Sequence, residues 1–123
     1  MKQIELSGMT TNDLVERFAQ IGVAQGQALL RGEYAKFNRL FRQMSAVSDE
    51  LKSRDGDQRR ALMTLYNYQD MQVRLKAAIH TLAVAPVEAR RMLQTIADSN
   101  WMPQAGDAGM SLSNLDRGVF KPT

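Results

Sequence analysis

The segment of residues 57–99 constrains the fold of this chain more than any other. Its apolar residues recur three and four positions apart, the spacing that places side chains on one face of an amphipathic helix. Asp57 and Asp70 each stand where they can cap a short helix, the first of which ends near residues 66–68. Pro86 stands where a first-turn proline is tolerated, and it therefore opens a third helix. The pattern predicts three short helices joined by tight turns.

The residues before this segment predict two longer helices. Thr10 or Thr11 is placed to cap a helix that ends near residue 30, where Gly32 follows. A second helix is expected from about residue 33 to residue 54. Its apolar stripe consists of Phe37, Leu40, Phe41, Met44, Val47 and Leu51. Two long helices joined by so short a turn form an antiparallel hairpin.

The two ends of the chain are expected to be less regular. Residues 1–10 are interpreted as a flexible N-terminal arm, and residues 101–109 as a turn-rich segment before a last short helix at 110–116. No stretch shows the alternation typical of a β-strand. With 123 residues and 44% hydrophobic content, the chain is long enough to bury a core. The prediction is an all-α protein of about five to six helices, with a single helical domain over residues 11–123.

The middle of the chain resembles a HEAT/armadillo-type repeat. Residues 61–65 match the first helix of such a unit, and residues 73–78 match the second, with Asp70 in the turn between them. The resemblance implies that Asp70 and Arg74 hold helix ends or neighbouring units together, and Pro86 is a third structural residue as the opener of its helix. About three stacked helix pairs would form a short α-α superhelix.

Over residues 11–122 the chain also resembles DUF2019, a bacterial family of domains of unknown function. The most specific parts of the resemblance are residues 73–78, 83–86 and 101–110. It implies a short HEAT/armadillo-like protein and brings no activity with it.

The sequence lacks the residue sets that most catalytic and metal sites require. It has no cysteine, which excludes thiolate chemistry, and His80 is its only histidine. A lone imidazole without a positioned nucleophile or second acid favours a helix-surface residue over a general base. Asp107 and Asp116 could in principle form a pair of carboxylates, but no nucleophile, metal set or cofactor motif accompanies them. We expect no enzymatic activity, no cofactor and no metal.

Two groups of residues are candidates for an interaction surface. The first gathers aromatic and polar side chains around the predicted turn and consists of Trp101, Gln104, Asp107 and Asp116. The alternative for Trp101 is that it covers the end of the core. The second group would line the inner wall of a superhelix and consists of Arg39, Arg42, Lys76 and His80. The alternative for this group is a set of solvated, ion-paired residues.

These observations favour a non-enzymatic protein–protein interaction module, a regulatory or immunity-type adaptor whose partner is another protein. The alternative is a nucleic-acid-binding domain with a mildly basic concave face, because the net charge is +3. No run of basic residues exceeds two, which disfavours that alternative. Neither a membrane span nor the apolar core of a signal peptide is present, so a cytoplasmic location is expected. A homodimer through Val119 or Phe120 stays open.

Overall fold

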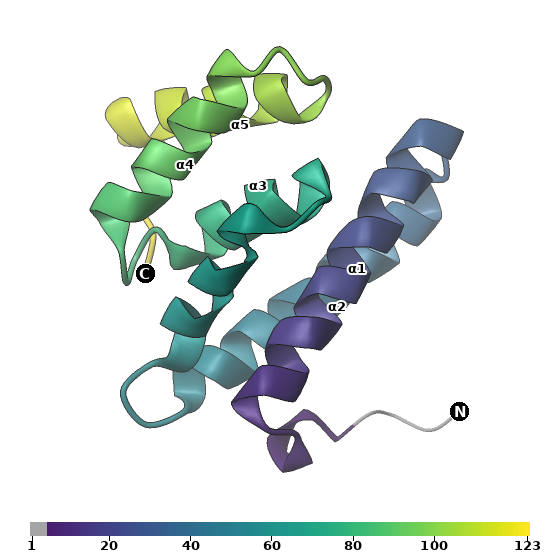
Figure 1. Ribbon diagram of the computed structural model, residues 1–123, viewed down its shortest axis with the longest axis vertical. Helices are drawn as coiled ribbons and strands as arrows, with labels where there is room; N and C mark the ends of the chain where they lie inside the picture. The colour runs from purple at the N-terminus through teal and green to yellow at the C-terminus, as the bar shows by residue number, and fades with distance from the viewer. Residues whose placement is uncertain (1–4) are drawn as a thin grey trace. The chain divides into compact units, whose positions relative to one another are not determined.

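The computed structural model describes residues 5–123, and every regular element in that part of the chain is a helix (Figure 1). The α-helices are α1 (Thr11–Arg31), α2 (Tyr34–Ser53), α3 (Met71–Thr81), α4 (Pro86–Asp98) and α5 (Gln104–Asp116). Two 3-10 helices, η1 (Leu6–Gly8) and η2 (Gln58–Asn67), complete the described chain. The all-α prediction is therefore confirmed.

The chain divides into two compact units, Met1–Ala61 and Leu62–Thr123, with η2 crossing the boundary. The first unit holds η1, α1 and α2, and the second holds α3, α4 and α5. The single domain expected over residues 11–123 stays a prediction, because two compact units can belong to one domain. The superhelix likewise stays a prediction.

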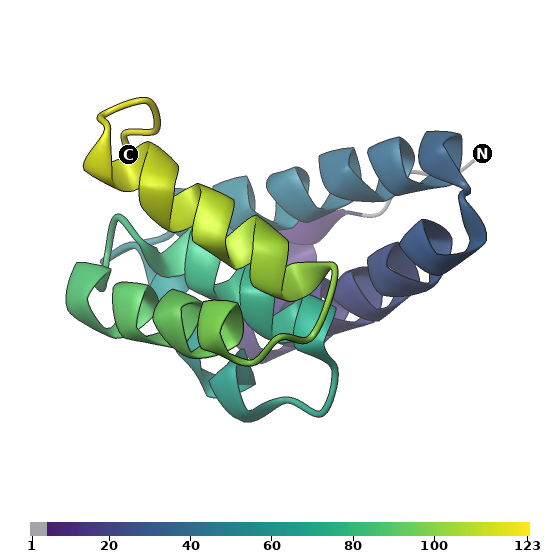
Figure 2. The same cartoon turned by 90° about the horizontal axis from the view of Figure 1, so that it is seen from above.

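The first unit is built on the expected antiparallel hairpin of α1 and α2, which lie side by side in Figures 1 and 2. Thr10 and Asp13 form a capping box at the start of α1, in which the Thr10 hydroxyl accepts from the Asp13 amide at 3.0 Å. Gly32 ends α1 with φ of 68°, a left-handed conformation that a residue without Cβ adopts readily. The buried stripes are Leu14, Phe18, Ile21 and Ala28 on α1 and Leu40, Met44, Val47 and Leu51 on α2.

Arg54 ties the segment before α1 to the end of α2. Its guanidinium donates to the backbone carbonyls of Leu6 at 3.1 Å and Met9 at 2.6 Å, and pairs with Glu50 at 3.0 Å. The part of the predicted N-terminal arm from Glu5 on thus forms a 3-10 turn with side-chain anchoring. Residues 1–4 of that arm lie outside the described residues.

The third predicted helix forms as the 3-10 helix η2 and not as an α-helix. Arg59, Leu62 and Leu65 are three residues apart and all buried, which is the period of a 3-10 helix. Asp57, the predicted cap of this helix, has a positive φ. Its φ is 51°, and its carboxylate binds the Arg59 guanidinium at 2.7 Å as well as the Arg59 amide at 3.3 Å. The Asp57 carboxylate therefore binds the Arg59 side chain in addition to a backbone amide at the start of η2.

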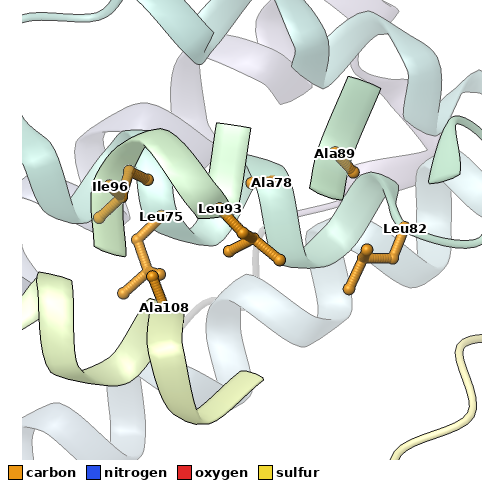
Figure 3. Packing of buried hydrophobic residues seen from close by; sticks show 7 residues of the cluster. All are labelled: Leu75, Ala78, Leu82, Ala89, Leu93, Ile96 and Ala108. Atoms are coloured by element: carbon orange, nitrogen blue, oxygen red, sulfur yellow. The ribbon is translucent and has the colours of Figure 1, made fainter. Parts of the chain in front are cut away.

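The second unit packs α3, α4 and α5 around one apolar cluster. Leucine, isoleucine and alanine side chains from all three helices meet there (Figure 3): Leu75, Ala78, Leu82, Ala89, Leu93, Ile96 and Ala108. Each helix contributes one fully buried alanine, and such small side chains allow close helix approach. Asp70 caps α3 by accepting from the Val73 amide at 3.1 Å, Arg74 donates to the Tyr68 carbonyl, and Pro86 opens α4.

The last helix begins earlier than the sequence predicted. The prediction placed a turn at 101–109 and a helix from 110, whereas α5 runs from Gln104. Gly106 and Gly109 have low helix propensity and gave the segment the character of a turn. Ala105 precedes the first of these glycines, Ala108 lies between the two, and both alanines are buried. Burial of these alanines offsets the poor propensity of the glycines, as tertiary packing commonly does.

Candidate interaction surfaces

Three large apolar side chains are exposed in the turn before α5 and on α5 itself, and we refer to them as the C-terminal patch. They are Trp101, Met102 and Met110, whose exposed fractions are 62%, 67% and 61%. The first two lie in the turn between α4 and α5, and the third lies on α5. Trp101, the most conspicuous candidate of the sequence, therefore does not cover the end of the core.

The absence of a side chain at Gly106 shapes this patch. A Cβ atom at that position would stand 3.1 Å from the Met102 Cε, so the methionine lies against the helix where the glycine leaves room. Gly106 and Met110 are four residues apart and so share one face of α5. Met102 and Met110 therefore belong to the same side of the helix. The Trp101 carbonyl accepts from the Ala105 amide at 2.8 Å, which fixes the α4–α5 connection to the first helical turn of α5.

Gln104 is not a surface residue, contrary to the prediction. Its side chain is buried, and its side-chain amide nitrogen donates to the side-chain oxygen of Gln72 on α3 at 2.9 Å. A buried amide needs such a partner, because an unpaired polar group away from water costs stability. Gln104 faces inward because it is the first residue of α5. The prediction placed this residue in a turn and therefore did not expect its burial.

Asp107 and Lys76 are linked by charge. Asp107 is exposed on α5, whereas Lys76 on α3 is partly buried. Burial lowers the pKa of the Lys76 ammonium below its ordinary value, and the negative charge of Asp107 partly opposes that shift. Lys76 is thus less available to an external partner than a fully exposed lysine.

Asp116 lies at the far end of α5 from Asp107. The two aspartates are nine residues apart on one helix, about 13 Å at the rise of an α-helix. They are therefore not close enough to act as paired carboxylates. Asp116 instead forms an ion pair with Arg90 of α4 at 2.6 Å, an exposed pair of the kind that contributes little to stability.

The four residues of the predicted basic wall belong to different units. Arg39 and Arg42 are exposed on α2 of the first unit, while Lys76 and His80 lie on α3 of the second. A common inner wall that contains all four stays a prediction. The ion-paired alternative does not hold for the two arginines, since no described residue forms an ion pair with either.

An exposed aromatic pair on α2 was not predicted. Phe41 was expected in the buried stripe, but 48% of this residue is exposed, and Tyr34 is 68% exposed. These residues are seven apart, which is two helical turns, so they share a face that differs from the Leu40 and Met44 face. The recurrence of two aromatics at that spacing was the available signal.

The described residues contain neither a metal cluster nor a membrane-spanning helix. No three His, Cys, Asp or Glu side chains among residues 5–123 come close enough to hold a metal ion. No helix in that range combines the length and apolar character that a bilayer crossing requires.

These observations define the class of protein: a small all-α protein with exposed apolar, aromatic and basic side chains. Residues 12–116 match the family model described as "Domain of unknown function (DUF2019)", and the chain belongs to that family. It is similar to a solved structure, described as the crystal structure of the protein RPA1889 from Rhodopseudomonas palustris CGA009. The two are 57% identical, with a TM-score of 0.94, over 98% of this chain and 100% of that one. No curated protein matches the chain.

Proposed function

We propose that this protein is a non-enzymatic, cytoplasmic protein–protein interaction module that holds a partner through the C-terminal patch. The observation that carries the proposal is the exposure of Trp101 and Met102 in the α4–α5 turn and of Met110 on α5. Tryptophan is among the residues that contribute most to binding energy at interfaces, and methionine is enriched there. A HEAT/armadillo-like stacking of the helices is part of the proposal, because such scaffolds present surfaces to other macromolecules.

The rigid support of the patch favours binding. Ala105 and Ala108 anchor the inner face of α5 in the second unit, and the Trp101 carbonyl belongs to the hydrogen bonding of its first turn. A partner that meets a preformed surface spends less free energy on ordering it. We infer that apolar side chains of the partner cover the two methionines and the indole.

Affinity capture with surface variants tests this proposal. The full-length chain is immobilised and exposed to a lysate of the cells in which it occurs, and captured proteins are quantified by mass spectrometry. The W101S/M102S variant should lose a protein that the wild type captures. The Val87→Ser variant is the matched control, because Val87 is also exposed but lies at the start of α4. It should retain the captured protein.

Two outcomes would count against the proposal. One is that no captured protein depends on Trp101 and Met102. The other is that nuclease treatment of the lysate removes every protein that does depend on them, which would favour nucleic-acid binding. Circular dichroism of each variant establishes that it is folded, and exposed positions such as these tolerate substitution within about 0.5 kcal/mol.

A further inference from the structure

The first four turns of α2 carry positive charge without any negative charge. From residue 34 to residue 48, the helix contains Lys36, Arg39 and Arg42 and no Asp or Glu. Acidic residues resume only at Asp49. The two arginines are exposed, and Lys36 is partly exposed.

These three cations are not paired with acidic side chains. Among residues 5–123, the ion pairs of the first unit join Arg54 to Glu50 and Arg59 to Asp57, and none reaches Lys36, Arg39 or Arg42. On α4, by contrast, Arg90 is paired with Asp116. The stretch of α2 is therefore a locally uncompensated positive surface on a chain whose net charge is only +3.

Two exposed aromatic side chains accompany this charge. Tyr34 and Phe41 are separated by two turns, about 10 Å along the helix. Arg42 follows Phe41 directly in sequence, and Asn38 lies between the aromatics on the same face. At about 100° per residue, Arg42 lies on the solvent side of α2, with Tyr34 and Phe41 towards one edge of that side and Arg39 towards the other, whereas Lys36 lies next to the buried side. We call the set of Tyr34, Arg39, Phe41 and Arg42 the α2 outer face.

We propose that the α2 outer face binds an acidic peptide segment of a partner protein. The guanidinium groups of Arg39 and Arg42 would receive carboxylates, for which their planar fork geometry is suited. Tyr34 and Phe41 would receive apolar side chains of the same segment. Aromatic residues and arginine, the types that form this face, are enriched at protein interfaces.

The number of cations favours a peptide over a nucleic acid. A protein that holds duplex DNA tightly commonly neutralises about six to ten phosphates, whereas this face offers the two cations Arg39 and Arg42. The proposal rests on the proposed function in that the chain is an interaction module. It does not rest on the C-terminal patch, which belongs to the other unit.

Isothermal titration calorimetry with a synthetic probe tests the proposal. The probe is a glutamate-rich peptide with interspersed leucines, and a peptide with lysine in place of every glutamate is the counterpart. The full-length chain should bind the acidic peptide and not the basic one. The R39E/R42E variant should raise the Kd about tenfold or more, since it turns two attractions into repulsions.

A charge-matched variant separates the site from net charge. R91E/R117E changes the net charge by the same amount at two exposed arginines of the other unit, and it should bind the acidic peptide almost as the wild type does. Tyr34→Ser should weaken binding, whereas Val87→Ser should not. The W101S/M102S variant should also retain the peptide, so that failure of the C-terminal patch and failure of the α2 outer face are distinguishable.

Three results would overturn the proposal. The first is that the wild type does not bind the acidic peptide. The second is that R91E/R117E weakens binding as much as R39E/R42E does, which would make the attraction a property of the whole charge. The third is that a single-stranded oligonucleotide binds more tightly than the peptide and depends on Arg39 and Arg42.

Discussion

Lys76 is the residue whose environment departs most from what its sequence position suggests. It was predicted on an inner wall open to a partner, yet it is partly buried, and burial holds the pKa of its ammonium below the ordinary value. Gln104 shows the same effect for an uncharged group, since its amide is satisfied inside the second unit by Gln72. The identity of a polar residue alone does not show whether it is available to a partner. Its burial must also be known.

The lowered pKa of Lys76 predicts a pH dependence of stability. The unfolded chain binds the Lys76 proton more tightly than the folded chain does, so this group adds stability as pH rises towards its ordinary pKa of 10.5. The Lys76→Met variant lacks this contribution. The unfolding free energy of the wild type minus that of the variant should therefore increase as the pH is raised towards that value.

Urea denaturation followed by circular dichroism measures that difference. Burial raises the pKa of the Tyr66 phenol, but both proteins contain this residue, so its effect cancels in the difference. Lys121→Met, a change at an exposed position, is the matched control. A difference that stays constant with pH would contradict the prediction.

The elements that the sequence predicted well are those with strong local signals. The capping box of Thr10 and Asp13, the left-handed Gly32 and the Asp70 cap each mark a boundary through a short-range hydrogen bond or a backbone preference. The start of α5 was wrong because it depends on packing, as Ala105 and Ala108 find their burial only once α3 and α4 are in place. No window of sequence contains that information.

A glycine-to-alanine substitution tests whether the glycines weaken α5. Gly109 lies inside the helix, and a Cβ there would meet nothing within 4 Å. Gly109→Ala should therefore raise the unfolding free energy by about 0.5–1 kcal/mol, because alanine loses less backbone freedom on folding. Gly106→Ala is the comparison, since its Cβ would push on Met102, and its gain should be smaller. If Gly109→Ala lowered the midpoint of thermal unfolding, glycine at this position would have another role.

Arg54 offers a test at the other end of the chain. Arg54→Lys removes the fork that reaches the carbonyls of Leu6 and Met9, and a lysine ammonium cannot keep the same set of hydrogen bonds. Amide exchange should become faster at Gly8 and Met9, with a loss of about 1–3 kcal/mol in stability. Arg39→Lys, on the exposed side of α2, should change neither quantity. Unchanged exchange at Gly8 in the Arg54→Lys variant would show that the 3-10 turn holds by itself.

At the scale of the whole molecule, the sequence predicted the class of fold better than the surface. Helical periodicity identified the hairpin of α1 and α2, but it assigned Phe41 to the core because an aromatic residue beside Leu40 fits an apolar stripe. The seven-residue spacing between Tyr34 and Phe41 indicates a second face, and the exposure of both residues confirms it. The two proposed surfaces lie in different units. Substitutions that test one surface therefore leave the residues of the other surface unchanged.

The exposed position of Trp101 has a practical consequence. It is the only tryptophan of the chain, so the intrinsic fluorescence excited at long wavelength comes from an indole in the C-terminal patch and from no other residue. An indole in water emits further to the red than one covered by apolar groups. Docking of a partner over the patch would therefore shift the emission to the blue, and the unlabelled protein reports on its own occupancy.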